Sequence, residues 1–421
     1  MSRLEELIQQ HCPDGVEYKP LGDCIKSLNT GLNPRQFFRL NTDDATNFYI
    51  TIREIQNNKV VFNDKTDRMN DEALKLCNNR SNLEKGDVLF SGTGTIGEVA
   101  ALEETPTNWN IKEGVYSIKP DPNILFYRYL MYLLQSNSIK QAYLKKAAGG
   151  TVKSVPMGEM RKLIIPVPPL PVQEEIVRIL DTLTELQAEL QAELQKRLQQ
   201  YNYYRDKLLT FNELIGGGYA VSVEWKKLGD IATDWYRGAG IKRDEVSEEG
   251  TPCNRYGENN TTYNSWFDEC VSHTDENKQP AKKYADYGDI LFAITSEDIP
   301  FIGNSVAYIG KERILVGGDI VVMKHTQNPK YMSYVLSTSD AVMQKGKGKV
   351  KSKVVHTNVP SLKEIVVPIP SLEEQERIAT ILDKFYALTT DITAGLPAEI
   401  EARRKQYEYY RDQLLTFKQK A

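Results

Sequence analysis

Three glycines, Gly92, Gly94 and Gly97, follow the apolar run GDVLF with the spacing G-x-G-x-x-G. This spacing is typical of loops that hold a pyrophosphate, but that chemistry requires a helix to begin at the glycines, because its free N–H groups and dipole bind the phosphates. The residues that follow, EVAALEETPTNWN, favour a second strand and a loop, since Val99 begins an apolar run and Pro106 is typical of turns. The glycines therefore do not predict a nucleotide site.

Other residue types that could do chemistry are scattered along the chain. The five cysteines include no C-x-x-C pair and the four histidines no H-x-x-x-H pair, so neither a disulfide framework nor a metal site is expected. No apolar run reaches the roughly 18 residues that a membrane span needs, and the start MSRLEELIQQ has the pattern of an amphipathic helix. These features predict a cytoplasmic chain without a metal or catalytic cluster.

Basic residues are concentrated in one place. The net charge of −4 argues against a protein that coats nucleic acid through bulk charge, so any nucleic-acid surface must be local. In QKGKGKVKSK, lysines alternate with small residues and predict a flexible loop that could neutralise phosphates; a solvated surface loop is the alternative. The lysines are Lys345, Lys347, Lys349, Lys351 and Lys353.

The elements that must position these residues occur twice. VEYKPLGD from Val16 returns as VEWKKLGD from Val223, GDVLF returns as GDILF, and IIPVPPLPVQEEIVRILD returns as VVPIPSLEEQERIATILD. QYNYYRDKLLTF from Gln200 returns as QYEYYRDQLLTF from Gln406. Matches in the same order along both halves indicate an internal duplication. The second copy has AITSEDIPFIG in place of SGTGTIG, so the shared part is structural and the glycine loop is a variable tip.

Each copy combines a mixed segment with a long helix. Short β-rich runs and one helical stretch predict an α/β (α+β) globule, and a proline-rich segment then leads into an apolar stripe of helical period. We expect two similar domains separated by a pair of long antiparallel coiled-coil helices with pseudo-twofold symmetry, the second helix being interrupted near Gly395 and Pro397. The expected segments are an N-terminal helical segment 1–15, domains 16–168 and 216–370, and long helices 169–215 and 371–421.

The duplicated GDVLF and GDILF runs, the two proline-rich segments and the twin QYxYYRD helix ends resemble the specificity subunits of type I restriction-modification systems. The resemblance covers both halves of the chain. It implies two target recognition domains, each reading half of a split double-stranded DNA site, and helices that hold two methyltransferase (modification) subunits. It also implies a non-catalytic chain without a cofactor, S-adenosylmethionine in the methyltransferase subunits, and restriction subunits that use ATP and Mg.

Candidate DNA-reading residues are polar or basic residues on the variable loops, for each of which an ordinary exposed polar group is the alternative. Lysines and hydroxyls can contact phosphates, and arginines can bridge a guanine edge. In the first domain they are Arg35, Ser91, Thr93, Thr95, Lys145, Lys146, Thr151 and Lys153. In the second they are Arg237, Lys242, Arg243, Arg255, Tyr256, Ser296 and the lysine loop.

The repeated helix ends contain more aromatic rings than one side of a helix can bury. We expect part of each cluster to pack within the chain and the rest to contact a methyltransferase subunit. An aromatic platform for single-stranded DNA is less favoured, because no basic groove accompanies the rings. The partner-binding candidates are Tyr201, Tyr204, Arg205, Leu208, Tyr407, Tyr410, Arg411 and Leu414.

Two other functions compete with DNA recognition by a subunit. A DNA adenine methyltransferase with its own recognition domain would need a cofactor loop and an N-P-P-Y-like or D-P-P-Y-like motif; NPRQFF at Asn33 and DPNILF at Asp121 lack the second proline. A coiled-coil adaptor without DNA function would lack basic loops. Binding of S-adenosylmethionine would identify the first, and salt-dependent binding of duplex DNA would argue against the second.

Overall fold

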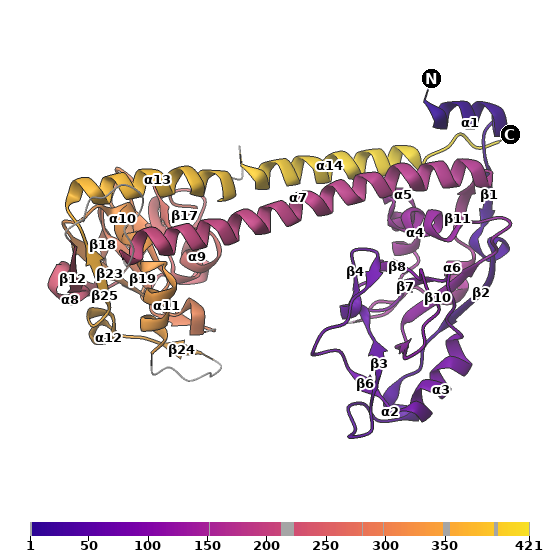
Figure 1. Ribbon diagram of the computed structural model, residues 1–421, viewed down its shortest axis with the longest axis horizontal. Helices are drawn as coiled ribbons and strands as arrows, with labels where there is room; N and C mark the ends of the chain where they lie inside the picture. The colour runs from indigo at the N-terminus through magenta and orange to yellow at the C-terminus, as the bar shows by residue number, and fades with distance from the viewer. Residues whose placement is uncertain are drawn as a thin grey trace. The chain divides into compact units, whose positions relative to one another are not determined.

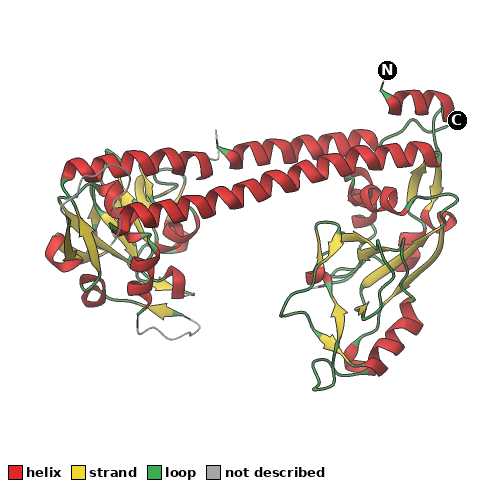
Figure 2. Ribbon diagram, in the orientation of Figure 1, coloured by secondary structure: helices red, strands yellow, loops and turns green. Residues whose placement is uncertain are grey.

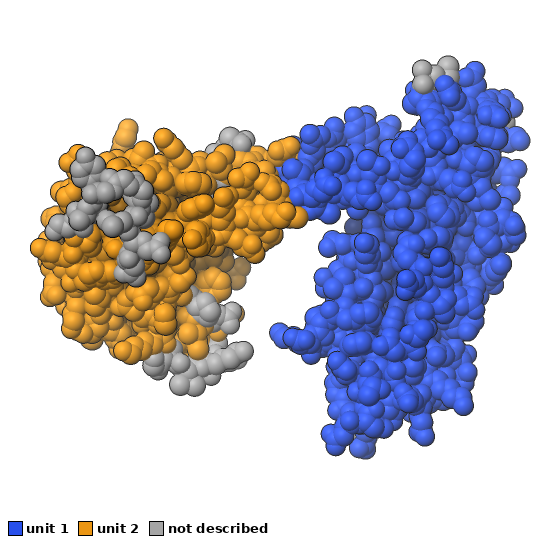
Figure 3. Space-filling model, in the orientation of Figure 1, with its two compact units in different colours: residues 1–190, 400–421 blue, residues 191–399 orange. Residues whose placement is uncertain are grey.

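The computed structural model describes residues 2–150, 152–211, 223–279, 281–297, 299–347, 354–390 and 395–420. The chain divides into two compact units (Figure 3): unit 1 comprises residues 1–190 and 400–421, and unit 2 comprises residues 191–399. Helices and strands are mixed in both units (Figure 2), which confirms the predicted α+β class. Among the described residues, no helix has the length and apolar character needed to cross a bilayer.

Unit 1 is built on an antiparallel sheet in the order β2-β10-β7-β8 and a smaller sheet in the order β6-β3-β9 (Figure 1). The strands are β1 (Glu17–Pro20), β2 (Ile25–Thr30), β3 (Asn47–Ile50), β4 (Ile55–Gln56), β5 (Lys59–Val60), β6 (Arg68–Met69), β7 (Val88–Ser91), β8 (Val99–Ala101), β9 (Trp109–Ile111), β10 (Val115–Pro120) and β11 (Ile164–Val167). The helices before the long one are α1 (Arg3–His11), α2 (Pro34–Phe37), α3 (Asp71–Ser81), α4 (Tyr127–Gln135), α5 (Asn137–Leu144) and α6 (Met157–Arg161).

Unit 2 repeats this plan with two five-stranded sheets, in the orders β13-β23-β19-β21-β16 and β14-β17-β15-β22-β18. The strands are β12 (Glu224–Lys227), β13 (Ala232–Arg237), β14 (Val246–Ser247), β15 (Thr251–Asn254), β16 (Trp266–Phe267), β17 (Ser272–Thr274), β18 (Tyr284–Ala285), β19 (Ile290–Ala293), β20 (Thr295–Ser296), β21 (Ser305–Tyr308), β22 (Ile314–Val316), β23 (Ile320–His325), β24 (Val355–His356) and β25 (Val366–Ile369). The helices are α8 (Leu228–Ile231), α9 (Tyr256–Thr261), α10 (Pro329–Leu336), α11 (Ser339–Gly346) and α12 (Val359–Lys363).

The repeated GDVLF and GDILF runs are central strands that are buried on both faces. Successive side chains of a strand point to opposite faces, so Val88 and Phe90 pack with α4, while Leu89 joins a second cluster with Ile111. The preceding aspartates are also buried, and burial raises the pKa of both carboxyl groups, Asp87 and Asp289. Each is paired with a lysine, at 3.1 Å and 2.8 Å respectively. Each also accepts a hydrogen bond from the backbone N–H three residues earlier, so the shared motif closes the turn before the strand.

The long helices are α7 (Leu170–Thr210), α13 (Leu372–Thr390) and α14 (Leu396–Leu414). The interruption expected near Gly395 is confirmed, since α13 and α14 are separate helices. A buried glutamine anchors the first turn of α7 and of α13: Gln173 accepts a hydrogen bond from the backbone N–H of Phe126 and donates to the carbonyl of Pro168. Gln375 makes the matching bonds with Asn328 and Pro370.

Each unit contains the start of one long helix and the end of another. In unit 1, Tyr407 of α14 packs on the cluster that contains Ile176 of α7; in unit 2, Tyr201 of α7 shares a cluster with Ile378 of α13. The end of one helix thus lies beside the beginning of the other, as an antiparallel pair requires. The apolar stripe is only partly covered, however, because Leu186 is 51% exposed and Leu388 is 61% exposed.

Candidate nucleic-acid interface

The glycine loop of unit 1 is shaped by packing. A Cβ atom on Gly92 would lie 2.2 Å from the Tyr116 ring, and one on Gly97 would lie 2.4 Å from the Tyr143 hydroxyl. Gly97 also has a φ of +102°, which favours glycine. Strand β8 follows the loop, so no helix N-terminus is available to hold a phosphate. The prediction of a strand in place of a nucleotide-binding helix is therefore confirmed.

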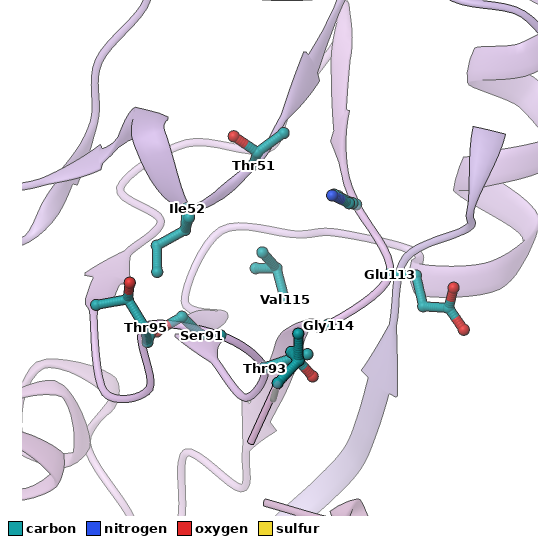
Figure 4. Close-up of a pocket in the computed structure, with 11 residues that line it drawn as sticks. Thr51, Ile52, Ser91, Thr93, Thr95, Glu113, Gly114 and Val115 are labelled. Atoms are coloured by element: carbon teal, nitrogen blue, oxygen red, sulfur yellow. The ribbon is translucent and has the colours of Figure 1, made fainter. Parts of the chain in front are cut away.

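A pocket of about 590 Å³ opens beside this loop (Figure 4). Its lining comes from the glycine loop, the turn between β9 and β10, the residues after β3, and Val152. The glycine loop and the segment that contains Val152 are held together, since the N–H of Gly94 donates to the carbonyl of Lys153 at 2.9 Å. The lining contains hydroxyl groups and one residue of each charge, Lys112 and Glu113, which suits a polar ligand. Among the described residues, no group of three His, Cys, Asp or Glu side chains could hold a metal ion.

The structure places the candidates of unit 1 in different environments. Thr93 and Thr95 are exposed and line the pocket, as Figure 4 shows. Ser91 also lines it, but its buried hydroxyl donates to the carbonyl of Thr95 and accepts from the N–H of Glu98. Ser91 therefore closes the loop, which corrects its assignment as an exposed reader.

The basic candidates of unit 1 are exposed but do not line the pocket. Lys145 and Lys153 have no carboxylate partner in the part of the chain that the structure describes, whereas Lys146 lies 3.5 Å from Glu159. Arg35 lies on the short helix α2. Their contacts with DNA stay predictions, and Thr151 lies outside the described residues.

In unit 2, two predicted residues flank one turn. Arg237 ends β13 and forms an ion pair with Asp319 at 2.8 Å, while Arg255 precedes α9 and lies beside Gly317. Three further candidates of unit 2 are exposed, and they are Lys242, Arg243 and Tyr256. Lys242 pairs with Glu245, whereas Arg243 makes no ion pair with another described residue.

Two predicted readers of unit 2 are buried. Ser296 is 6% exposed within the strand pair β20 and β24. Lys345 is 7% exposed because α11 continues to Gly346, and its ammonium group donates to Ser305 and to the carbonyl of Leu336. The burial of both side chains argues against the predicted DNA contacts. Lys347 is exposed, and Lys349, Lys351 and Lys353 lie outside the described residues.

The helix-end tyrosines divide into buried and exposed members. Tyr201 is 7% exposed, and burial raises its pKa to about 12. The guanidinium of Arg205 lies 5.7 Å from the Tyr201 ring, and Arg411 repeats this arrangement with Tyr407 at 5.8 Å. These four side chains make contacts within the chain, and their assignment as partner contacts stays a prediction.

The exposed members form the surface that a partner could cover. Tyr204 is 40% exposed and Tyr410 is 42% exposed. Tyr203 and Tyr409 are 60% exposed, although the sequence interpretation did not select them. Their position follows from the sequence, because they lie two residues after the buried Tyr201 and the half-buried Tyr407, which places them on another side of the helix. Leu208 and Leu414 are half-buried.

The aspartates of the twin QYxYYRD motifs have a role that the sequence did not suggest. Asp206 accepts hydrogen bonds from the backbone N–H and the hydroxyl of Ser339, at 3.2 Å and 2.5 Å. Asp412 accepts from the backbone N–H and the amide of Asn137, at 3.0 Å and 2.6 Å. Each carboxylate therefore caps the first turn of a helix, α11 or α5, in the globule of the other copy.

Comparison with known proteins identifies the same family that the sequence motifs resemble. The family model described as the type I restriction modification DNA specificity domain matches residues 13–200 and 221–402. The Escherichia coli type I restriction enzyme EcoR124I/EcoR124II specificity subunit is 34% identical over 61% of this chain and 63% of its own length. A putative type I restriction enzyme specificity subunit from Haemophilus influenzae is 34% identical over 64% of this chain and 68% of its own length.

The fold agrees with this relationship. A solved chain, from work on complex assembly and conformational transition of the type I R-M system, matches with a TM-score of 0.60 at 16% identity, over 95% of this chain and 97% of that chain. Each of the two family matches covers most of one copy of the duplication. This chain therefore belongs to the family of type I restriction-modification DNA specificity subunits.

Proposed function

We propose that this chain is the DNA-recognition subunit of a type I restriction-modification complex, with one unit reading each half of a bipartite duplex site. One observation carries the proposal: the two copies share their structural contacts but differ at the exposed tips of the same strands. Gly92 and Gly97 shape the loop after β7 in unit 1, whereas the residues after the equivalent strand β19 in unit 2 are ITSEDIPFIG. Like scaffolds with unlike tips suit two different half-sites.

The long helices are the proposed seat of two methyltransferase subunits. The exposed side chains Tyr203, Tyr409, Leu186 and Leu388 support this, because apolar and aromatic surface on helices is stabilised when a partner covers it. In this proposal the chain itself is not catalytic and works in the cytoplasm. S-adenosylmethionine belongs to the methyltransferase subunits, and ATP and Mg belong to restriction subunits that join through them.

Salt-dependent binding tests the proposal. The chain, purified with the methyltransferase subunits of the same system, is expected to bind one bipartite duplex sequence and to lose affinity steeply as salt rises. Methylation mapping of the assembled complex would then return two half-sites with an unread spacer. Methyl transfer by the isolated, homogeneous chain, or failure of the complex to prefer any duplex sequence, would contradict the proposal.

A further inference from the structure

The strand registers identify which residues occupy the same place in the two units. Val115 pairs with Ser91 in unit 1, and Ile320 pairs with Ala293 in unit 2, so the residues just before these positions, Gly114 and Asp319, correspond. Gly114 lies in the pocket lining of unit 1. The matching place in unit 2 is therefore the turn from Gly317 to Asp319.

The residues around this turn differ in kind between the units. Ile50 pairs with Ile111 and Asn254 pairs with Val316, so Thr51 of the unit 1 pocket corresponds to Arg255 of unit 2. In the same way, Tyr116 pairs with Thr30 in unit 1 and Val321 pairs with Arg237 in unit 2. Thr30 and Arg237, which each end a strand, therefore correspond. Unit 2 thus places two arginines where unit 1 has two threonines.

Arg237 is both exposed and fixed. Its side chain is 60% exposed, yet Nη2 donates to Oδ1 of Asp319 at 2.8 Å and Nε donates to the carbonyl of Gly318. A guanidinium carries five N–H donors, and these two bonds leave three donors unused. An arginine held in this way has already lost much of the side-chain freedom that binding would cost. Nearby, Gly317 and Gly318 have no side chains to obstruct a ligand.

The chemistry of the unused donors selects the ligand. A guanidinium offers donors only, in a rigid planar fork, and a guanine presents two neighbouring acceptors, N7 and O6, in the major groove. Adenine presents an acceptor beside a donor at the same edge, so it matches the fork less well. Phosphate would also accept these donors, but that contact carries no base preference.

We propose that Arg237 reads a guanine in the half-site bound by unit 2, and that Asp319 is the positioning residue that holds its guanidinium. This inference rests on the proposed function, because it requires unit 2 to face duplex DNA. The half-site of unit 1 lacks the equivalent contact, since Thr30 occupies the corresponding position and its hydroxyl is bonded to the backbone at Val115 and Gly114.

Base preference measured on the assembled complex tests the inference. The full chain with its methyltransferase subunits would be selected against randomised duplex DNA, as wild type and as Arg237→Ala, Arg237→Lys and Asp319→Asn. For Arg237→Ala, the preference for G at one position of one half-site should fall by about tenfold or more, with the other half-site unchanged. Arg237→Lys should retain affinity better than base preference, because lysine lacks the fork. Asp319→Asn should weaken the preference severalfold while G remains favoured.

A matched control distinguishes a loss of base recognition from a loss of the folded structure. Lys227 forms a 2.6 Å ion pair with Glu364 and is 50% exposed, so Lys227→Ala removes a comparable surface pair away from the turn. It should change neither half-site, and all variants should keep the wild-type unfolding midpoint within the range of surface substitutions. An unchanged base preference in Arg237→Ala, or a uniform loss of affinity for all sequences, would overturn the guanine assignment. A wild-type complex without any preferred duplex would instead overturn the proposed function.

Discussion

Replacing Lys345 with methionine tests the cost of burying an ammonium group in unit 2. The lysine is 7% exposed, its Nζ lies 3.0 Å from the Ser305 hydroxyl and 2.8 Å from the Leu336 carbonyl, and no carboxylate pairs with it among the described residues. Burial lowers the pKa of its ammonium group from 10.5 to about 7. Methionine has a similar length and no charge, so Lys345→Met removes the cost of burying the ammonium group.

The magnitude follows from the difference between the folded and unfolded pKa. A lowering from 10.5 to about 7 corresponds to about 5 kcal/mol of destabilisation, which is fully present below pH 7. Between pH 7 and 10.5 the unfolded chain binds more protons than the folded chain, so stability rises with pH and the cost disappears above 10.5. The variant loses two hydrogen bonds worth about 1 kcal/mol each. We therefore expect Lys345→Met to be more stable by about 2 to 3 kcal/mol at pH 7, and no more stable near pH 10.

Urea unfolding at pH 7, 8 and 9 measures this difference. Three of the four tryptophans, Trp225, Trp235 and Trp266, belong to unit 2, and Trp235 stacks on Phe292 beside Lys345, so tryptophan fluorescence follows this unit. The control is Lys347→Met, because Lys347 is exposed and its replacement should leave the pH dependence unchanged. A variant at Lys345 that retains the wild-type slope of stability with pH, or that is less stable at pH 7, would refute the reasoning.

Three further predictions concern the helix ends and the basic loop. Asp206→Ala and Asp412→Ala should each destabilise their unit by about 1 kcal/mol in urea unfolding, because each removes a helix cap; equal stability would argue that water replaces it. Tyr203→Ala and Tyr409→Ala should keep the fold but lower methyltransferase capture in a pull-down, whereas unchanged capture would place the partner elsewhere. Gln replacements of the four lysines in 347–353 should flatten the salt dependence of DNA binding by up to about 4 units without changing the preferred sequence, and an identical salt slope would show that they do not contact DNA.

The architecture could be predicted because the duplicated residues make duplicated contacts. Gln173 and Gln375 anchor equivalent helix starts, and Asp181 and Asp383 accept hydrogen bonds from equivalent tyrosine hydroxyls at 2.7 Å and 2.6 Å. A repeat that preserves such pairs appears as matching motifs, so the long helices and mixed domains could be inferred from the sequence. The contact partners could not, since Asp206 and Asp412 cap helices in the globule of the other copy, far away along the chain.

The error at Lys345 has a physical cause. Alternating lysines and small residues predict a solvated loop, but α11 extends through Lys345 and turns its side chain into the core. The first copy held the signal: aligning the repeats places Tyr143, a residue suited to burial, at the position of Lys345, and both lie against an equivalent phenylalanine, Phe90 or Phe292. The local composition therefore predicted a loop at Lys345, whereas comparison of the two repeats would have predicted a buried helical position.

The division between shared and unlike contacts has a consequence for how such a chain can change. The shared contacts lie at strand starts and helix ends: Asp87 and Asp289 close the turns before the central strands, and the glutamines and capping aspartates fix the long helices. The unlike residues lie at the opposite end of the sheet, where β13 ends at the exposed Arg237. Because sites without shared partners affect stability independently, substitutions at the tips should alter DNA preference without disturbing helix packing. Substitutions at the caps should weaken the fold without redirecting the half-site, so the two properties can be changed separately.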